Sequence, residues 1–165
     1  MTKTLRLFVI SVAIAAGALP AHAQMLPDYP ISLRNIASGL CLDIFQNDTR
    51  PGGQLIQWQC HGNANQQWML YRRGQTYEIV NQNSGLCLDV RGGQRNNGVD
   101  VIQWTCMRQP NQLWYVTPGP DGLILRNVNS NRCLDVPRSS THAGERLVQW
   151  DCNGGRNQSF GAEVG

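Results

Sequence analysis

The chain has 165 residues, of which 41% are hydrophobic and 15% charged, and this length fits one globular domain and excludes a multidomain enzyme of ordinary size. The net charge is +3, and it falls to +1 without Lys3 and Arg6, because the remaining twelve Arg face eleven Asp and Glu. A charge so weak and scattered argues against nucleic acid or an anionic membrane surface as partner, since both need clustered cations.

Residues 1–23 have the pattern of a secretory signal peptide. The two cations just named precede an apolar run at 7–19, and Ala21-His22-Ala23 is an A-x-A cleavage site. A membrane anchor is the alternative, but the run is shorter than the roughly 20 residues that span a bilayer, and Pro20 breaks it. We therefore expect cleavage before Gln24, a mature domain over 24–165 without membrane insertion, and a secreted or periplasmic location.

The cysteines reveal a threefold internal repeat of 46 residues. Segments 35–68, 81–114 and 127–160 superpose without a gap, and 11 of the 34 columns are identical in all three copies. In the first copy these columns are Asn35, Ser38, Cys41, Leu42, Asp43, Gly52, Gln57, Trp58, Cys60, Asn65 and Gln66.

Equivalent repeats should form equivalent disulfides, one in each copy. The expected pairs are Cys41 with Cys60, Cys87 with Cys106 and Cys133 with Cys152. By the loop-entropy model each bridge contributes on the order of 3 kcal/mol. Metal ligation is not expected, because there is no C-x-x-C pair and His61 and His142 are not at equivalent positions.

Short apolar or alternating runs, separated by Gly, Pro, Asn and Asp, predict an all-β fold. In the first copy we expect four strands, near 31–36, 40–44, 54–59 and 66–71, and therefore twelve in all. The aligned turn residues Gly52, Gly98 and Gly144 are expected to adopt a positive φ at the surface. Three units too small to bury their own apolar faces must share a core, which favours a β-trefoil over a propeller with only three blades.

The repeated motifs resemble those of the ricin B-chain type lectin domain, over essentially the whole mature chain. They are C-L-D-[IV], Q-W-x-C and N-Q-x-W, the last weakened in the third copy, where Phe160 replaces Trp. The resemblance implies a β-trefoil that binds sugars.

An Asp stands two residues after the first Cys of every copy: Asp43, Asp89 and Asp135. An ionised carboxylate only accepts hydrogen bonds, and its two oxygens suit adjacent hydroxyls of a sugar. The alternative is an Asp that caps a turn by accepting backbone N–H groups.

A Trp stands two residues before the second Cys: Trp58, Trp104 and Trp150. The apolar face of a pyranose ring packs on an indole while its hydroxyls reach nearby polar groups. The alternative is that this Trp only covers the disulfide and the core.

An amide pair completes the set: Asn65 with Gln66, Asn111 with Gln112 and Asn157 with Gln158. The resemblance implies that the Asp and the Asn bind the sugar, that the Trp stacks on it and that the Gln braces the site. Trp68, Trp114 and Phe160 are assigned to the core. Many family members carry Gln two residues before the stacking aromatic. Here Ile56 holds that position and Gln57 directly precedes Trp58, so either Gln57 points inward or a bulge redirects the Trp.

We therefore expect a lectin with up to three sites, for galactose-containing or related glycans. Catalysis is not expected, because no nucleophile or metalloprotease motif is present, the three Asp belong to separate lobes, and no cofactor is implied. Two alternatives remain, a sugar-targeting subunit that serves a separate toxin or enzyme chain and a protein-binding trefoil such as an inhibitor. Sequons at Asn47 and Asn157 matter only in a glycosylating host.

Overall fold

Short runs of alternating side chains, each ended by a turn, make strands the main element of the chain. The computed structural model describes residues 28–164, so the expected signal peptide lies outside the described residues. The strands are β1 (Ile31–Asn35), β2 (Cys41–Ile44), β3 (Leu55–Trp58), β4 (Trp68–Arg73), β5 (Thr76–Asn81), β6 (Cys87–Val90), β7 (Val99–Trp104), β8 (Leu113–Pro118), β9 (Leu123–Asn127), β10 (Cys133–Asp135), β11 (Val148–Trp150) and β12 (Phe160–Val164). Within residues 28–164 no helix is long and apolar enough to cross a membrane.

Six short 3-10 turns join these strands. They are η1 (Phe45–Asn47), η2 (Ala64–Gln66), η3 (Arg91–Gly93), η4 (Pro110–Gln112), η5 (Pro137–Ser139) and η6 (Arg156–Gln158). The predicted strands are confirmed within a few residues, except that the fourth begins at Trp68, because Asn65 and Gln66 lie in η2.

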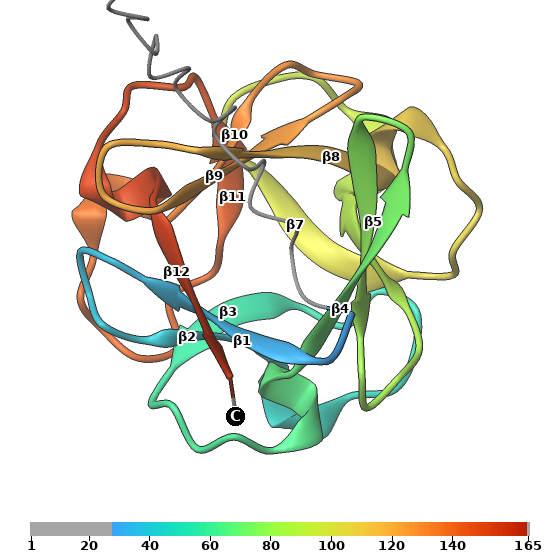
Figure 1. The fold of residues 1–165 in the computed structure, drawn as a ribbon, viewed down its shortest axis with the longest axis horizontal. Coiled ribbons are helices and arrows are strands. Elements are labelled where there is room, and N and C mark those ends of the chain that lie inside the picture. The colour runs from blue at the N-terminus through green and yellow to red at the C-terminus, as the bar shows by residue number, and fades with distance from the viewer. Residues whose placement is uncertain (1–27, 165) are drawn as a thin grey trace, which may run out of the picture.

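The pairing of the strands makes this fold a β-trefoil. The second and third strands of each repeat form a hairpin, as β2 does with β3, and the fourth strand pairs with the first strand of the next repeat, as β4 does with β5. The chain closes on itself because β12, the last strand, pairs with β1, the first. Figure 1 shows the resulting three lobes around a common centre.

A single core fills that centre and is shared by the three lobes. Trp68, Trp114 and Phe160 are fully buried there, as the sequence predicted, together with leucine, isoleucine and valine side chains from all three repeats. The indole Nε1 of Trp68 donates to the carbonyl of Leu42 at 3.3 Å, so the ring's one polar group is satisfied inside the core.

Each lobe carries one disulfide in the predicted pairing: Cys41–Cys60, Cys87–Cys106 and Cys133–Cys152. The predicted turn glycines also have the expected backbone conformation, with φ of 94° at Gly52, 80° at Gly98 and 89° at Gly144. A side chain is strained at such an angle, which explains the Gly at this column of every repeat.

Gln57 points inward and forms hydrogen bonds to another repeat. Of the two possibilities left open by the sequence, an inward Gln57 or a bulge that redirects the Trp, the structure has the first. Its Oε1 accepts the hydroxyl of Ser38 at 2.7 Å, and its Nε2 donates to the carbonyls of Ser140 and His142, both at 2.9 Å. Gln103 makes the same bonds to repeat one and Gln149 to repeat two. These three buried amides therefore form a closed ring of ties between the lobes.

Candidate functional site

The hairpin register places the repeated Asp and Trp on one face of each lobe. Asp43 lies opposite Ile56, and Cys41 lies opposite Trp58. Because residues two apart in a strand share a face, Asp43, Ile56 and Trp58 all face the same side. There they line a shallow hollow of about 230 Å³, and Ile56 contributes an apolar wall to it.

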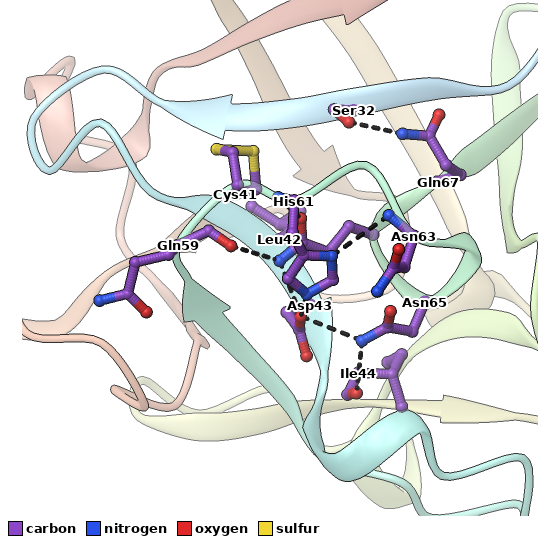
Figure 2. A network of polar contacts seen from close by, with 12 residues as sticks. Ser32, Cys41, Leu42, Asp43, Ile44, Gln59, His61, Asn63, Asn65 and Gln67 are labelled. Atoms are coloured by element: carbon purple, nitrogen blue, oxygen red, sulfur yellow. Dashed lines mark hydrogen bonds and ion pairs between the residues drawn. A yellow bond between two sulfur atoms is a disulfide. The ribbon is translucent and has the colours of Figure 1, made fainter. Parts of the chain in front are cut away.

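One oxygen of the Asp43 carboxylate is held by the two amides that follow the second Cys. Its Oδ2 accepts Asn65 Nδ2 at 3.0 Å, a bond that Figure 2 shows, and Gln66 Nε2 at 2.8 Å. Gln66 is fixed in turn, because its Nε2 also donates to the carbonyl of Gln59 and its Oε1 accepts the backbone N–H of His61. The carboxylate is thus positioned by side chains that are themselves immobilised.

The same arrangement recurs in the other two lobes. Asp89 Oδ2 accepts Asn111 Nδ2 at 3.0 Å and Gln112 Nε2 at 2.8 Å. Asp135 Oδ2 accepts Asn157 Nδ2 at 3.0 Å and Gln158 Nε2 at 2.7 Å. The predicted site residues of each repeat are therefore brought together three times.

The carboxylates do not cap turns. Within the described part of the chain, the hydrogen bonds that Asp43 accepts reach Oδ2 and come from side chains, not from backbone N–H groups. Next to it, the buried Oδ1 of Asn65 has no hydrogen-bond partner there. A buried acceptor without a partner costs free energy, and a ligand hydroxyl would satisfy it.

The three candidate stacking residues are partly open to solvent rather than buried. Trp58 and Trp104 are each 40% exposed and Trp150 is 45% exposed, whereas Trp68 is fully buried. A large apolar ring with this exposure beside a polar group is available for stacking. Covering the core therefore does not account for these three indoles.

Burial raises the pKa of each carboxyl. Desolvation raises the pKa of Asp89 to about 6, although hydrogen bonds from Gln112 and Asn111 and the charge of Arg91 oppose the shift. Desolvation also raises the pKa of Asp43 and of Asp135, and the neighbouring amides again oppose it. Keeping these groups ionised at neutral pH therefore costs folding free energy, as is common for groups kept for function.

The hollows differ at positions that the repeat does not share. His61 Nε2 lies 3.4 Å from Asp43 Oδ2, while Met107 and Asn153 hold the equivalent positions beside the other two Cys. The hollow around Asp89 measures about 490 Å³ and includes Met107 and Arg91. Sequence reasoning missed these residues because they vary between copies. Their only sequence signal is that His61 and Met107 directly follow a repeated Cys and that Arg91 directly follows the C-L-D-[IV] motif.

The geometry gives neither a facing pair of carboxylates nor a metal centre. The three Asp lie in separate lobes, and residues 28–164 hold no group of three or more His, Cys, Asp and Glu placed to bind a metal ion. What each lobe offers is a fixed acceptor, an amide and an open aromatic face.

A model of the ricin-type β-trefoil lectin domain matches residues 29–160. The chain belongs to this family. The ricin-type lectin domain is a carbohydrate-binding, non-catalytic fold, and the predicted resemblance is confirmed.

Solved structures similar to this chain include a designed threefold-symmetric protein, ThreeFoil. It is 32% identical, with a TM-score of 0.80 over 82% of this chain and 98% of that one. An exo-β-1,3-galactanase from Clostridium thermocellum is 31% identical, with a TM-score of 0.79 over 84% of this chain and 30% of that one. The haemolytic lectin CEL-III is 33% identical, with a TM-score of 0.67 over 81% and 29%. This chain therefore spans less than a third of the latter two proteins.

Proposed function

We propose that this ricin-type trefoil is a secreted lectin with up to three sugar sites, one in each lobe. The observation that carries the proposal is the threefold recurrence of a buried carboxylate, held through one oxygen, beside an exposed indole. A purely structural role does not require a charge whose burial costs stability, whereas a sugar hydroxyl gains a charge-assisted hydrogen bond from it.

Each residue type has a distinct part in the proposed sites. In the first lobe the Asp43 carboxylate accepts hydroxyl protons, Asn65 accepts through its free Oδ1, and the pyranose ring stacks on Trp58. Gln66 does not need to touch the sugar, because its bonds hold Asp43 and the chain after Cys60. The corresponding residues have the same roles around Asp89 and Asp135.

Galactose-containing glycans are the ligand class we favour. One similar chain is an exo-β-1,3-galactanase, which is 31% identical to this chain. This similarity supports the choice of galactose-containing ligands. A shallow site with one stacked ring should bind a monosaccharide with a dissociation constant of roughly 1 mM to 1 μM. Three sites on one rigid domain would raise the apparent affinity for a multivalent surface by about 10²-fold or more.

A glycan array with the mature, oxidised protein tests the proposal. The comparison variant changes Asp43, Asp89 and Asp135 to Asn, which retains shape but removes the charged acceptors. A matched control changes the exposed Asp28, Asp121 and Glu163 to their amides, which alters the net charge equally. We expect a coherent set of terminal sugars to bind the wild type and the control but not the triple Asp variant. Absence of sugar binding by folded wild type would overturn the proposal.

A second candidate is that the lectin targets a separate catalytic or toxin chain to a glycan. The galactanase and the haemolytic lectin support it, because in both a similar trefoil makes up less than a third of a larger chain. Isolation of the protein from its natural source would test this candidate, since a partner subunit would co-purify with it.

Export is also part of the proposal. Three disulfides fit an extracellular or secreted protein. Mass spectrometry of the exported protein should find an N-terminus at Gln24, and retention of residues 1–23 would contradict signal cleavage.

A further inference from the structure

A hollow of about 420 Å³ lies outside the three lectin sites, over the junction of the first and second repeats. It is lined by Tyr71, Arg73 and Glu78 from the β4–β5 hairpin, and by Val80, Gly85 and Arg108. Cys106 of the second disulfide closes one side. None of the repeated sugar-site residues takes part in it.

The second repeat differs from the other two at the floor of this hollow. The position of Val80 is Arg34 in the first repeat and Arg126 in the third, directly before the repeated Asn. Arg34 lies over its turn, so that a Cβ on Gly39 would be 3.3 Å from the guanidinium, and Arg126 donates to Asn131 over the equivalent turn. A Cβ on the equivalent Gly85 would meet nothing within 4 Å. The shorter Val80 therefore leaves the space open.

The second repeat also holds a strained cation at the rim. Arg108 has φ of 55°, whereas the equivalent residues of the other repeats are Gly62 and Gly154, both with φ of 72°. A side chain in the left-handed region is strained relative to Gly. Strain of this kind is commonly retained where the side chain has a function, and this one lines the hollow.

The remaining groups give the hollow one net positive charge and an aromatic wall. Glu78 is only 3% exposed and accepts Arg73 Nε at 2.6 Å, so these two charges cancel. The Arg73 guanidinium lies 5.9 Å from the ring centre of Tyr71, which is 44% exposed. Arg108 makes no ion pair within residues 28–164 and supplies the uncompensated charge.

We propose that this hollow binds an acidic sugar unit, with Arg108 contacting its carboxylate or sulfate group and Tyr71 packing on its ring. An arginine fork suits either planar carboxylate or tetrahedral sulfate oxygens, and an exposed phenol ring suits the apolar face of a pyranose. The acidic group distinguishes this ligand from the neutral sugars expected at the three Asp-containing sites.

The hollow adjoins the second lectin site along the segment 106–109. Met107 and Gln109 line the hollow around Asp89, while Cys106 and Arg108 line this one. An oligosaccharide with a neutral sugar at Asp89 and an acidic unit at Arg108 would contact both. That extension rests on the proposed function, whereas the acidic-sugar hollow itself does not.

Nuclear magnetic resonance titration of ¹⁵N-labelled mature protein tests the proposal. The probes are methyl β-D-glucuronide, galactose 6-sulfate, uncharged methyl β-D-galactoside and inorganic sulfate. We expect both acidic sugars to shift the amide of Gly85 saturably, and the uncharged sugar to leave it unchanged. A response to only one acidic sugar would identify carboxylate or sulfate as the group bound. An equal response to inorganic sulfate would show a general anion effect and overturn the proposal.

Two variants separate binding from folding. Arg108→Gly restores the residue of the other repeats and removes the strain, so it should fold at least as stably while binding the acidic sugars about tenfold or more weakly. Val80→Arg restores the covering arginine of the other repeats and should block the hollow. Unchanged binding by Arg108→Gly would overturn the proposal.

Asp89→Asn separates this proposal from the lectin function. It should abolish galactoside shifts around Trp104 while leaving acidic-sugar shifts around Gly85 in place. Galactoside binding without any acidic-sugar response would leave the lectin function standing and this inference refuted. Acidic-sugar binding without galactoside binding would support this inference and refute the proposed galactoside sites.

Discussion

Gly144 lies against the indole of Trp58, although the two residues belong to different repeats. A Cβ on Gly144 would be 3.5 Å from Cζ3 of the ring. Gly52 has the same relation to Trp104, at 3.7 Å, and Gly98 to Trp150, at 3.5 Å. The turn of one repeat thus lies against the aromatic residue of the next repeat, although the residues that line the hollow at Asp43 all belong to the first repeat.

Truncation of the exposed indole should affect sugar binding, whereas truncation of the buried indole should affect stability. Trp58→Ala should weaken sugar binding at the first site while lowering the free energy of unfolding by less than about 1 kcal/mol, because the ring is partly exposed. Trp68→Ala should cost about 3–5 kcal/mol, because it empties the centre of the core. Chemical denaturation beside a binding titration checks both, and a large stability loss in Trp58→Ala would show that its ring is structural.

The inter-repeat amides should matter for stability rather than for ligand contact. Gln57→Ala leaves the Ser38 hydroxyl and two carbonyls of the third repeat without their partner, so it should lower the free energy of unfolding by about 1–3 kcal/mol. The matched control is Gln59→Ala, at an exposed side chain two residues away, which should stay within about 0.5 kcal/mol of wild type. Equal effects of the two substitutions, measured by denaturation, would contradict the bracing role.

Sugar binding at the second site should weaken as the pH falls through about 6. Burial raises the pKa of Asp89 to about 6, and protonation below that value removes the charged acceptor. A binding titration of a variant in which only this site is active, with Asp43→Asn and Asp135→Asn, should show the decline between pH 7 and 5. Binding that is flat over this range would show that the charge is not used.

The stability contribution of Asp89 has the opposite dependence on pH. Since its folded-state pKa is raised above the ordinary value of 3.8, its contribution is fully present below about pH 3.8 and is lost as the pH rises through about 6. Asp89→Asn removes this loss. The unfolding free energy of the variant, relative to that of the wild type, should therefore increase from pH 4 to pH 7. Denaturation curves at both pH values measure it, and a gain that shrank with rising pH would contradict the assignment.

His61 should distinguish the first site from the other two. Its charge and its hydrogen bond lower the pKa of Asp43 and so oppose the desolvation that raises it. His61→Met, which introduces the residue of the second repeat, should therefore raise the pKa of Asp43 and move the loss of binding to higher pH. Carboxyl ¹³C titration follows the shift, with His142→Met as control at an exposed histidine outside the Asp43 hollow. A pKa unchanged by His61→Met would contradict the assignment.

Repetition is what made the fold and most of the candidate site predictable. A residue such as Asp43 or Gln57 appears three times at one spacing, so its column is visible, and the two repeated Cys columns predict the disulfides. His61, Arg91 and Met107 could not be found in this way, because each occurs once. The contact of Gly144 with Trp58 was not visible in the sequence for another reason. The two residues are 86 positions apart, and backbone hydrogen bonds between the third and first repeats, such as that from Gly144 N–H to the Gln57 carbonyl, hold them side by side.

The ring of ties through Gln57, Gln103 and Gln149 has a consequence for how the molecule opens. Every lobe holds a turn of its neighbour, and the backbone N–H groups of Gly52, Gly98 and Gly144 donate to the carbonyls of those same glutamines. No lobe can then detach without breaking its bonds to the other two. The backbone amides of these three glycines should exchange their hydrogens with solvent only when the whole domain unfolds. A single repeat cut from this chain would contain the residues of a sugar site but would not fold into one.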